Sequence, residues 1–147
     1  MKSRAIALTV LSLVFAAGAQ AADAQPQFAP MAPPLPFPPA VLVNDVLYLS
    51  GQIGNGPGNK LPEGIEAQGR QAMENVSAVL KGQGASLGDV FKCTVMLADM
   101  KQWAAFNAVY VSFFDPKRLP VRSAFGVNGL VSGALVQVEC WAFAPRR

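Results

Sequence analysis

The alternation of apolar and polar residues along the chain predicts a set of short strands. Two apolar runs are separated by Asn44 and Asp45, a pair typical of turns, and therefore predict a hairpin. The expected strands are residues 41–43, 46–50, 90–97, 121–127 and 136–143. They leave two intervals in which apolar residues recur at helical spacing instead.

The first interval, residues 63–81, predicts an amphipathic helix that ends at Gly82. The second begins after Asp99, whose carboxylate is an expected N-cap, and is predicted to end at Asp115-Pro116. The expected inner face of this second helix is Trp103, Phe106, Val109, Tyr110 and Phe113. We interpret this aromatic stripe as core.

The predicted order is β–α–β–α–β–β, an α+β domain over residues 41–147 with both helices on one face of the sheet. The other face of the sheet also needs a cover, and one chain of this size has no element left to supply it. We therefore expect the protein to oligomerise through the sheet.

Residues 1–21 have the layout of a secretory signal peptide. Lys2 and Arg4 precede an apolar run of 15 residues, and Ala19-Gln20-Ala21 is a small-x-small cleavage pattern. The alternative is an uncleaved anchor, but the run is shorter than the roughly 20 residues that a spanning helix needs. We expect a secreted or periplasmic protein in which residues 22–40, with seven of the twelve prolines, form a linker.

The composition excludes several classes of functional site. Removal of Lys2 and Arg4 lowers the net charge from +3 to +1, and no basic stripe for nucleic acid remains. The chain contains no His, which excludes His-based triads and His metal sites. Cys93 and Cys140 are too few for structural zinc. We interpret them as two small buried side chains, with a disulfide as the alternative in an oxidising compartment.

Two ionisable residues occur inside apparent strands, Arg122 in "PVRSAF" and Glu139 in "VQVEC". Arg offers a planar fork of donors that suits a carboxylate, and Glu in a partly desolvated cleft can exchange a proton. Together they make a minimal site for hydrolysing a small carboxylated substrate. The alternative is an internal Arg122–Glu139 salt bridge, because structural ion pairs imitate functional sites.

Longer stretches carry a family resemblance. "LYLSGQIG" (47–54), the helix signature at 66–100, "FNAVYVSFF" (106–114), "PVRSAFGV" (120–127) and "ALVQVECWAFA" (134–144) together resemble the RidA (YjgF/UK114) family of enamine/imine deaminases. The resemblance implies a chorismate-mutase-like fold and a homotrimer with a central β-barrel and three clefts between subunits.

The resemblance also implies roles for individual residues. Arg122 would clamp the substrate carboxylate and Glu139 would position or activate water, while Ala124, Ser50, Gly51 and Asn107 would line the cleft. The implied reaction is hydrolysis of a 2-imino acid to a 2-keto acid and ammonia, with no metal or organic cofactor.

The chain departs from the family pattern at Ala124, at a further expected substrate-binding position, Phe37, and in its N-terminus. Phe37 stands where the family often has a ligand-contacting Tyr, and Ala124 stands where many members have Cys. The predicted signal peptide also separates the chain from cytosolic imine sources. The alternative function is a non-enzymatic trimer that binds small carboxylates at the same clefts. A chaperone-like or ribonuclease role is a third hypothesis, disfavoured for RNA cleavage by the lack of His and of a basic stripe.

Overall fold

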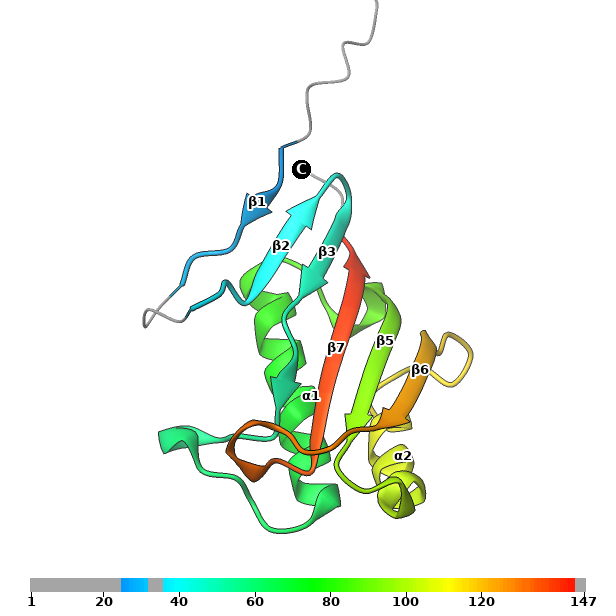
Figure 1. Ribbon diagram of the computed structural model, residues 1–147. Helices are drawn as coiled ribbons and strands as arrows, with labels where there is room; N and C mark the ends of the chain where they lie inside the picture. The colour runs from blue at the N-terminus through cyan, green and yellow to red at the C-terminus, as the bar shows by residue number, and fades with distance from the viewer. Residues whose placement is uncertain (1–24, 32–35, 145–147) are drawn as a thin grey trace, which may run out of the picture.

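The computed structural model describes residues 25–31 and 36–144 as one mixed sheet with two α-helices (Figure 1). The expected signal peptide at residues 1–21 lies outside the described residues. Within the described part, no helix is long and apolar enough to cross a membrane. The strands are β1 (Gln27–Phe28), β2 (Ala40–Val43), β3 (Val46–Leu49), β4 (Gln52–Ile53), β5 (Val90–Leu97), β6 (Val121–Gly126) and β7 (Val136–Phe143). The helices are α1 (Ile65–Gly82) and α2 (Trp103–Val111).

The sheet follows the order β1-β2-β3-β7-β5-β6, and β4 also pairs with β7. The last strand, β7, therefore lies in the middle, antiparallel to both β3 and β5. The β5–β6 pair is parallel, which the intervening helix α2 makes possible. The predicted α+β fold is confirmed.

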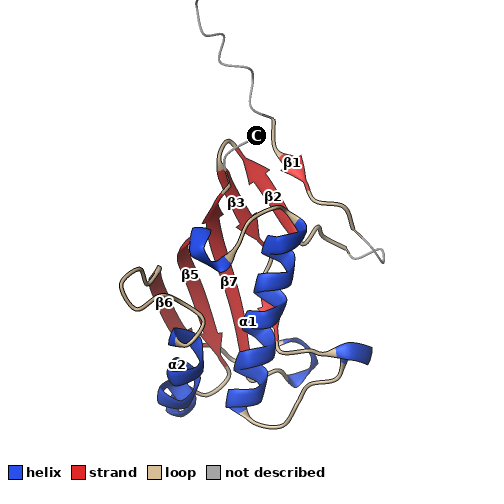
Figure 2. Cartoon of the chain, turned by 180° about the vertical axis from the view of Figure 1, so that it is seen from behind, coloured by secondary structure: helices blue, strands red, loops and turns tan. Residues whose placement is uncertain are grey.

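Both helices cover the same face of the sheet (Figure 2). Along α1 the buried side chains recur at helical spacing, and α2 packs against it where Gly69 allows close approach: a Cβ there would lie 3.0 Å from the Phe106 ring. Fully buried side chains between helices and sheet include Leu47, Met73, Val76, Leu80, Val95, Phe106, Tyr110, Val136 and Val138. The helices and the sheet thus share a single core, which fixes the face of the sheet on which each strand residue lies.

The opposite face of the sheet carries no helix (Figures 1 and 2). Strand alternation, together with a register shift between Val90 and Lys92, places on it several large side chains that are at least one-third exposed. They include Tyr48, Phe91, Val121, Phe125 and Phe143. We call this surface the open face.

Two boundaries differ from the expectation. Helix α2 ends at Val111 and not at Asp115-Pro116, because the chain turns there through hydrogen bonds from Ser112, Phe113 and Phe114 to carbonyls three residues earlier. Within the predicted linker, Gln27–Phe28 pairs with β2 and Ala29 is buried, so this part of the proline-rich stretch docks onto the sheet.

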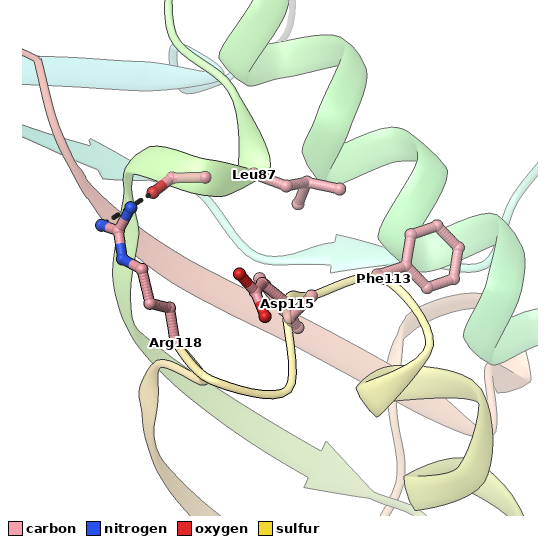
Figure 3. A pocket seen from close by; sticks show the side chains of 6 residues that line it. Leu87, Phe113, Asp115 and Arg118 are labelled. Carbon is pink, nitrogen blue, oxygen red and sulfur yellow. Dashed lines mark hydrogen bonds between the residues drawn. The ribbon is translucent and has the colours of Figure 1, made fainter.

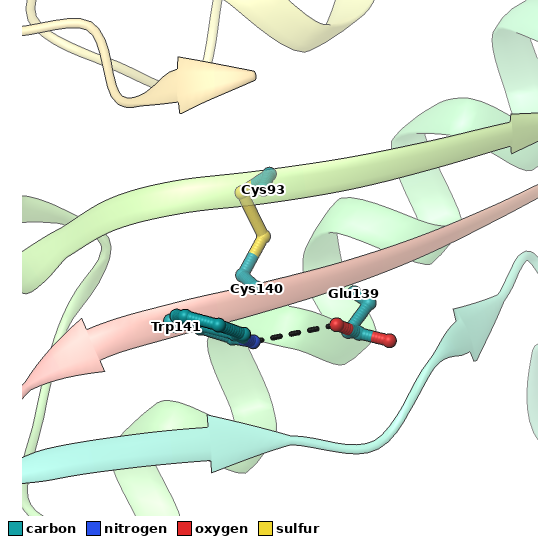
Figure 4. Close-up of a disulfide and its surroundings, with 4 residues drawn as sticks. All are labelled: Cys93, Glu139, Cys140 and Trp141. Carbon is teal, nitrogen blue, oxygen red and sulfur yellow. Dashed lines mark hydrogen bonds between the residues drawn. A yellow bond between two sulfur atoms is a disulfide. The ribbon is translucent and has the colours of Figure 1, made fainter. Parts of the chain in front are cut away.

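The cysteines correct a second expectation. We interpreted Cys93 and Cys140 as independent buried side chains, but the structure joins them in a disulfide (Figure 4). They lie directly opposite each other on β5 and β7, with Cα atoms 4.1 Å apart. The two cysteines are 47 residues apart in sequence, so only the register of β5 and β7 shows that they are neighbours.

Candidate functional site

Arg122 lies on β6 and its side chain points toward α2. In the parallel β5–β6 ladder Arg122 pairs with Cys93, which is buried in the core beneath the helices. Because neighbouring residues in register share a face, Arg122 is held on the helix-covered side of the sheet. A guanidinium at this place needs specific partners, since burial of an unpaired charge is costly.

Three side chains of α2 hold the guanidinium. Asn107 accepts a hydrogen bond from Nη2 of Arg122 at 2.7 Å. The ring centroids of Trp103 and Tyr110 lie 4.5 and 4.4 Å from its central carbon. Positions 103, 107 and 110 are one helical stripe, so α2 presents a ring, an amide and a second ring to the same group.

The other terminal nitrogen, Nη1 of Arg122, is buried and has no hydrogen-bond partner. A buried donor without a partner is rare and asks for an explanation, such as a ligand that binds there. Asn107 occupies one terminal nitrogen, and the two aromatic rings restrict the plane of the group. The arrangement thus leaves one cationic N–H donor of Arg122 without an acceptor inside the chain, and a carboxylate oxygen is an acceptor that suits such a donor.

Tyr110 is also buried, with 2% of its surface exposed, and its hydroxyl has no partner. Burial raises the pKa of Tyr110 to about 12, and the positive charge of Arg122 opposes part of that rise. The phenol therefore stays neutral and protonated at ordinary pH. It supplies a ring to Arg122 without supplying a compensating negative charge.

Ala124 follows two residues after Arg122 and therefore lies on the same face of β6, opposite Val95. The structure thus joins Arg122 to Asn107 by a hydrogen bond and places Ala124 on the same face of β6 as Arg122. Trp103 and Tyr110 complete this half of the site. Sequence reasoning assigned both to the core, and only their helical spacing from Asn107 could have signalled their contact with Arg122.

Glu139 lies on the opposite side of the sheet. It pairs with Thr94, the neighbour of Cys93, so alternation places it on the open face. Its Oε1 atom accepts a hydrogen bond from Nε1 of Trp141 at 3.3 Å (Figure 4). Within the described residues no ion pair joins Arg122 to Glu139, so the salt bridge that we weighed for this pair is not formed in one chain.

Ser50 and Gly51 lie beside Glu139 and not beside Arg122. Gln52, the next residue, pairs with Val138, and a Cβ on Gly51 would come within 2.4 Å of the Gln137 amide nitrogen. A larger residue at position 51 would therefore require the Gln137 side chain to move. The Ser50 hydroxyl donates to the Pro38 carbonyl at 2.7 Å, which ties this loop to the segment carrying Phe37.

Phe37 is 53% exposed, and within the part of the chain that the structure describes it makes no ring contact or hydrogen bond with Arg122 or Glu139. The predicted site residues therefore fall into two groups. Arg122, Asn107 and Ala124 form one group under α2, and Glu139, Ser50 and Gly51 form another near β7. A single chain holds the two halves on different faces of its sheet.

One pocket of the described surface is lined by none of the residues of these two groups (Figure 3). It has a volume of about 230 Å³ and is lined by Leu87, Gly88, Phe113, Phe114, Asp115 and Arg118. Arg118 donates a long hydrogen bond of 3.5 Å to the Gly88 carbonyl at its rim. Among the described residues no cluster of three or more His, Cys, Asp or Glu side chains could hold a metal ion.

Comparison with known proteins identifies the family. The family model described as endoribonuclease L-PSP matches residues 27–144. A goat (Capra hircus) protein named 2-iminobutanoate/2-iminopropanoate deaminase is 38% identical over 109 residues, which cover 73% of this chain and 79% of the goat protein.

Solved structures agree with this result. Yeast Mmf1 superimposes with a TM-score of 0.75 at 34% identity, over 82% of this chain and 99% of Mmf1. The structure of E. coli TdcF with bound serine gives a TM-score of 0.70 at 32% identity, over 82% of this chain and 94% of TdcF. Fold, matched length and motif content agree, and the chain belongs to the RidA family.

Proposed function

We propose that this protein is a RidA-type deaminase that hydrolyses 2-imino acids, or their enamine tautomers, to 2-keto acids and ammonia. The observation that carries the proposal is the buried, partnerless Nη1 atom of Arg122 beside a guanidinium fixed by Asn107 and two rings. Such a group suits the carboxylate that every 2-imino acid carries. The name of the goat relative and the bound serine of TdcF support the same ligand class.

The chemistry needs few groups. Arg122 binds the carboxylate and so fixes the neighbouring C=N carbon in space. Water adds to that carbon, its proton passes to nitrogen, and the resulting carbinolamine expels ammonia as the C=O bond forms. Glu139 accepts the proton from water and returns one to the leaving nitrogen. Positioning of the two reactants supplies much of the rate in so simple a site.

The proposal requires two copies of the chain in one site. Arg122 lies under α2 and Glu139 lies on the open face, so a cleft containing both must join one chain's Arg122 to another chain's Glu139. A homotrimer that buries the open face in a central barrel would provide such clefts and would cover the exposed apolar residues of that face.

We also propose that the protein is exported. Residues 1–21 have the charge, length and cleavage pattern of a signal peptide. The disulfide between Cys93 and Cys140 supports export, because disulfides persist mainly in oxidising compartments. The imino acid would then arise outside the cytoplasm.

The family's name refers to an endoribonuclease, but the chain contains no His for acid–base cleavage of RNA, and imine hydrolysis is the reaction that its ionisable residues support. The second candidate is a trimer that only binds small carboxylates, which the serine bound to TdcF favours. Calorimetry that detects 2-keto acid binding, without turnover of any imine, would select this candidate.

The test measures keto-acid release from 2-iminopropanoate generated in situ by an amino-acid oxidase. Wild type should accelerate release above the spontaneous rate, and Arg122→Ala should abolish the acceleration. Arg122→Lys should retain only part of the acceleration, because an ammonium keeps the positive charge but cannot donate two parallel hydrogen bonds to a carboxylate. Equal rates for wild type and Arg122→Ala would refute the role of Arg122.

A further inference from the structure

Trp141 lies next to Glu139 on the open face of β7 and is fixed from three sides. Its ring centroid lies 4.9 Å from that of Tyr48 on β3 and 6.5 Å from that of Phe91 on β5, both edge-on. The Lys92 ammonium lies 3.9 Å above the ring. Tyr48 and Lys92 are also the cross-strand partners of Trp141, so the sheet register itself assembles the cluster.

The indole N–H of this fixed ring is directed at the Glu139 carboxylate. An indole nitrogen can only donate, so in the 3.3 Å contact Trp141 is the donor and Oε1 of Glu139 is the acceptor. At this length the hydrogen bond alone is weak, but the ring that makes it cannot turn away without losing three contacts. The Lys92 cation draws electron density from the ring and makes the N–H group a better donor.

The contact restricts Glu139 without blocking it. Oε1 is engaged by Trp141, whereas Oε2 has no hydrogen-bond partner among the described residues. One oxygen is therefore anchored and the other is available to water. The relation mirrors the other half of the site, where Trp103 restricts the Arg122 guanidinium. Each of the two tryptophans of the chain contacts one of the two proposed functional charges.

We infer that Trp141 is a positioning residue that holds the Glu139 carboxylate in the orientation needed to accept a proton from water. The inference rests on the proposed function, because it assigns Glu139 the role of proton acceptor. It adds a residue that neither the family resemblance nor the spacing of the motifs assigns to the site.

Trp141→Phe tests the inference. Phenylalanine keeps a six-membered aromatic ring between Tyr48 and Lys92, and it removes only the pyrrole ring of the indole with its N–H donor. We expect kcat to fall about tenfold, a part of the roughly 10²–10⁴-fold that acid–base catalysis contributes, with KM unchanged. Phe143→Leu is the matched control. It removes a ring from the same face of the same strand, two residues away, and leaves a large apolar side chain for the subunit contact, so it should keep the wild-type oligomer in light scattering and the wild-type kcat and KM.

A second readout is independent of turnover. In a Trp103→Phe background Trp141 gives the only indole N–H resonance, since the chain has two tryptophans. Glu139→Leu should shift this resonance upfield by removing the acceptor. An unmoved resonance overturns the inference whatever the activity is.

The outcomes separate the two proposals. If wild type hydrolyses the imine and Trp141→Phe retains its kcat, the inference fails and the proposed function stands. If wild type shows no hydrolysis, the proposed function fails and with it the catalytic purpose of the contact. The indole resonance then decides alone whether Trp141 holds Glu139.

Discussion

Arg122 and Glu139 project from opposite faces of one sheet, although only β5 separates their strands. Arg122 pairs with Cys93 and Glu139 pairs with Thr94, its immediate neighbour on β5. A shift of one residue in a strand exchanges the two faces, so adjacent partners mean opposite directions. Neither face of the sheet holds both charges, so a site that contains both can form only when chains assemble.

Asn107→Asp should weaken substrate binding more than Asn107→Ala. Aspartate keeps the size and the acceptor of Asn107 but adds a negative charge beside the guanidinium, where it competes with the substrate carboxylate. We expect KM for the imine to rise on the order of tenfold or more in the aspartate variant, with the folded state retained. Steady-state kinetics check this result, and an aspartate variant with wild-type KM would contradict an anion-binding role for Arg122.

The free energy of unfolding should fall in strongly alkaline solution because the Tyr110 phenol ionises more readily in the unfolded chain. Burial raises its pKa to about 12 from 10.0, so the unfolded chain loses the phenol proton first. The stabilisation is complete below about pH 10 and is lost between about pH 10 and 12, by about 2–3 kcal/mol. Urea unfolding of wild type and Tyr110→Phe across this range measures the difference. Parallel curves for the two proteins would show that the phenol does not ionise on unfolding.

The disulfide should contribute substantially to stability. It closes a loop of 47 residues between β5 and β7, and a loop of this size predicts a loss of about 2–4 kcal/mol when it is opened. The Cys93→Ala/Cys140→Ala variant should therefore unfold at lower temperature than wild type. Reductant should lower the melting temperature of wild type and leave that of the variant unchanged. A wild type insensitive to reductant would indicate that the thiols are free.

Export predicts a defined N-terminus. If residues 1–21 are a signal peptide, protein recovered from outside the cytoplasm should begin at Ala22. Substitution of Ala19 and Ala21 by large residues should leave the precursor uncut. Mass spectrometry of the recovered chain distinguishes the two forms, and a full-length chain in the cytoplasm would contradict the proposal.

Much of the fold was predictable because its strands and helices have clear local signals. The strand at 90–97 matches β5, and the hairpin around Asn44 matches β2 and β3, where Asn44 adopts a positive φ of 54° that suits a tight turn. The uncovered sheet face also followed from counting elements. The end of α2 was less predictable, because the chain leaves the helix through local turns before the proline is reached.

The site was predictable only in part, since its geometry depends on register. Sequence and resemblance together proposed Arg122, Asn107 and Glu139 as site residues, but they did not show that the two charges lie on opposite faces of the sheet. The disulfide was only the second choice for the same reason, because Cys93 and Cys140 meet only through the β5–β7 pairing. The sequence analysis assigned Trp103 and Tyr110 to the core and gave Trp141 no role, and the contacts of all three with charged groups appear only in three dimensions.

The central claim is that each active site combines Arg122 of one chain with Glu139 of another. Complementation tests it most directly. Arg122→Ala and Glu139→Gln should each be inactive, but the two variants refolded together in equal amounts should regain imine hydrolysis. Random assembly gives an intact pair in about a quarter of the clefts, so about a quarter of the wild-type activity is expected. Mixtures no more active than either variant alone would contradict a shared site.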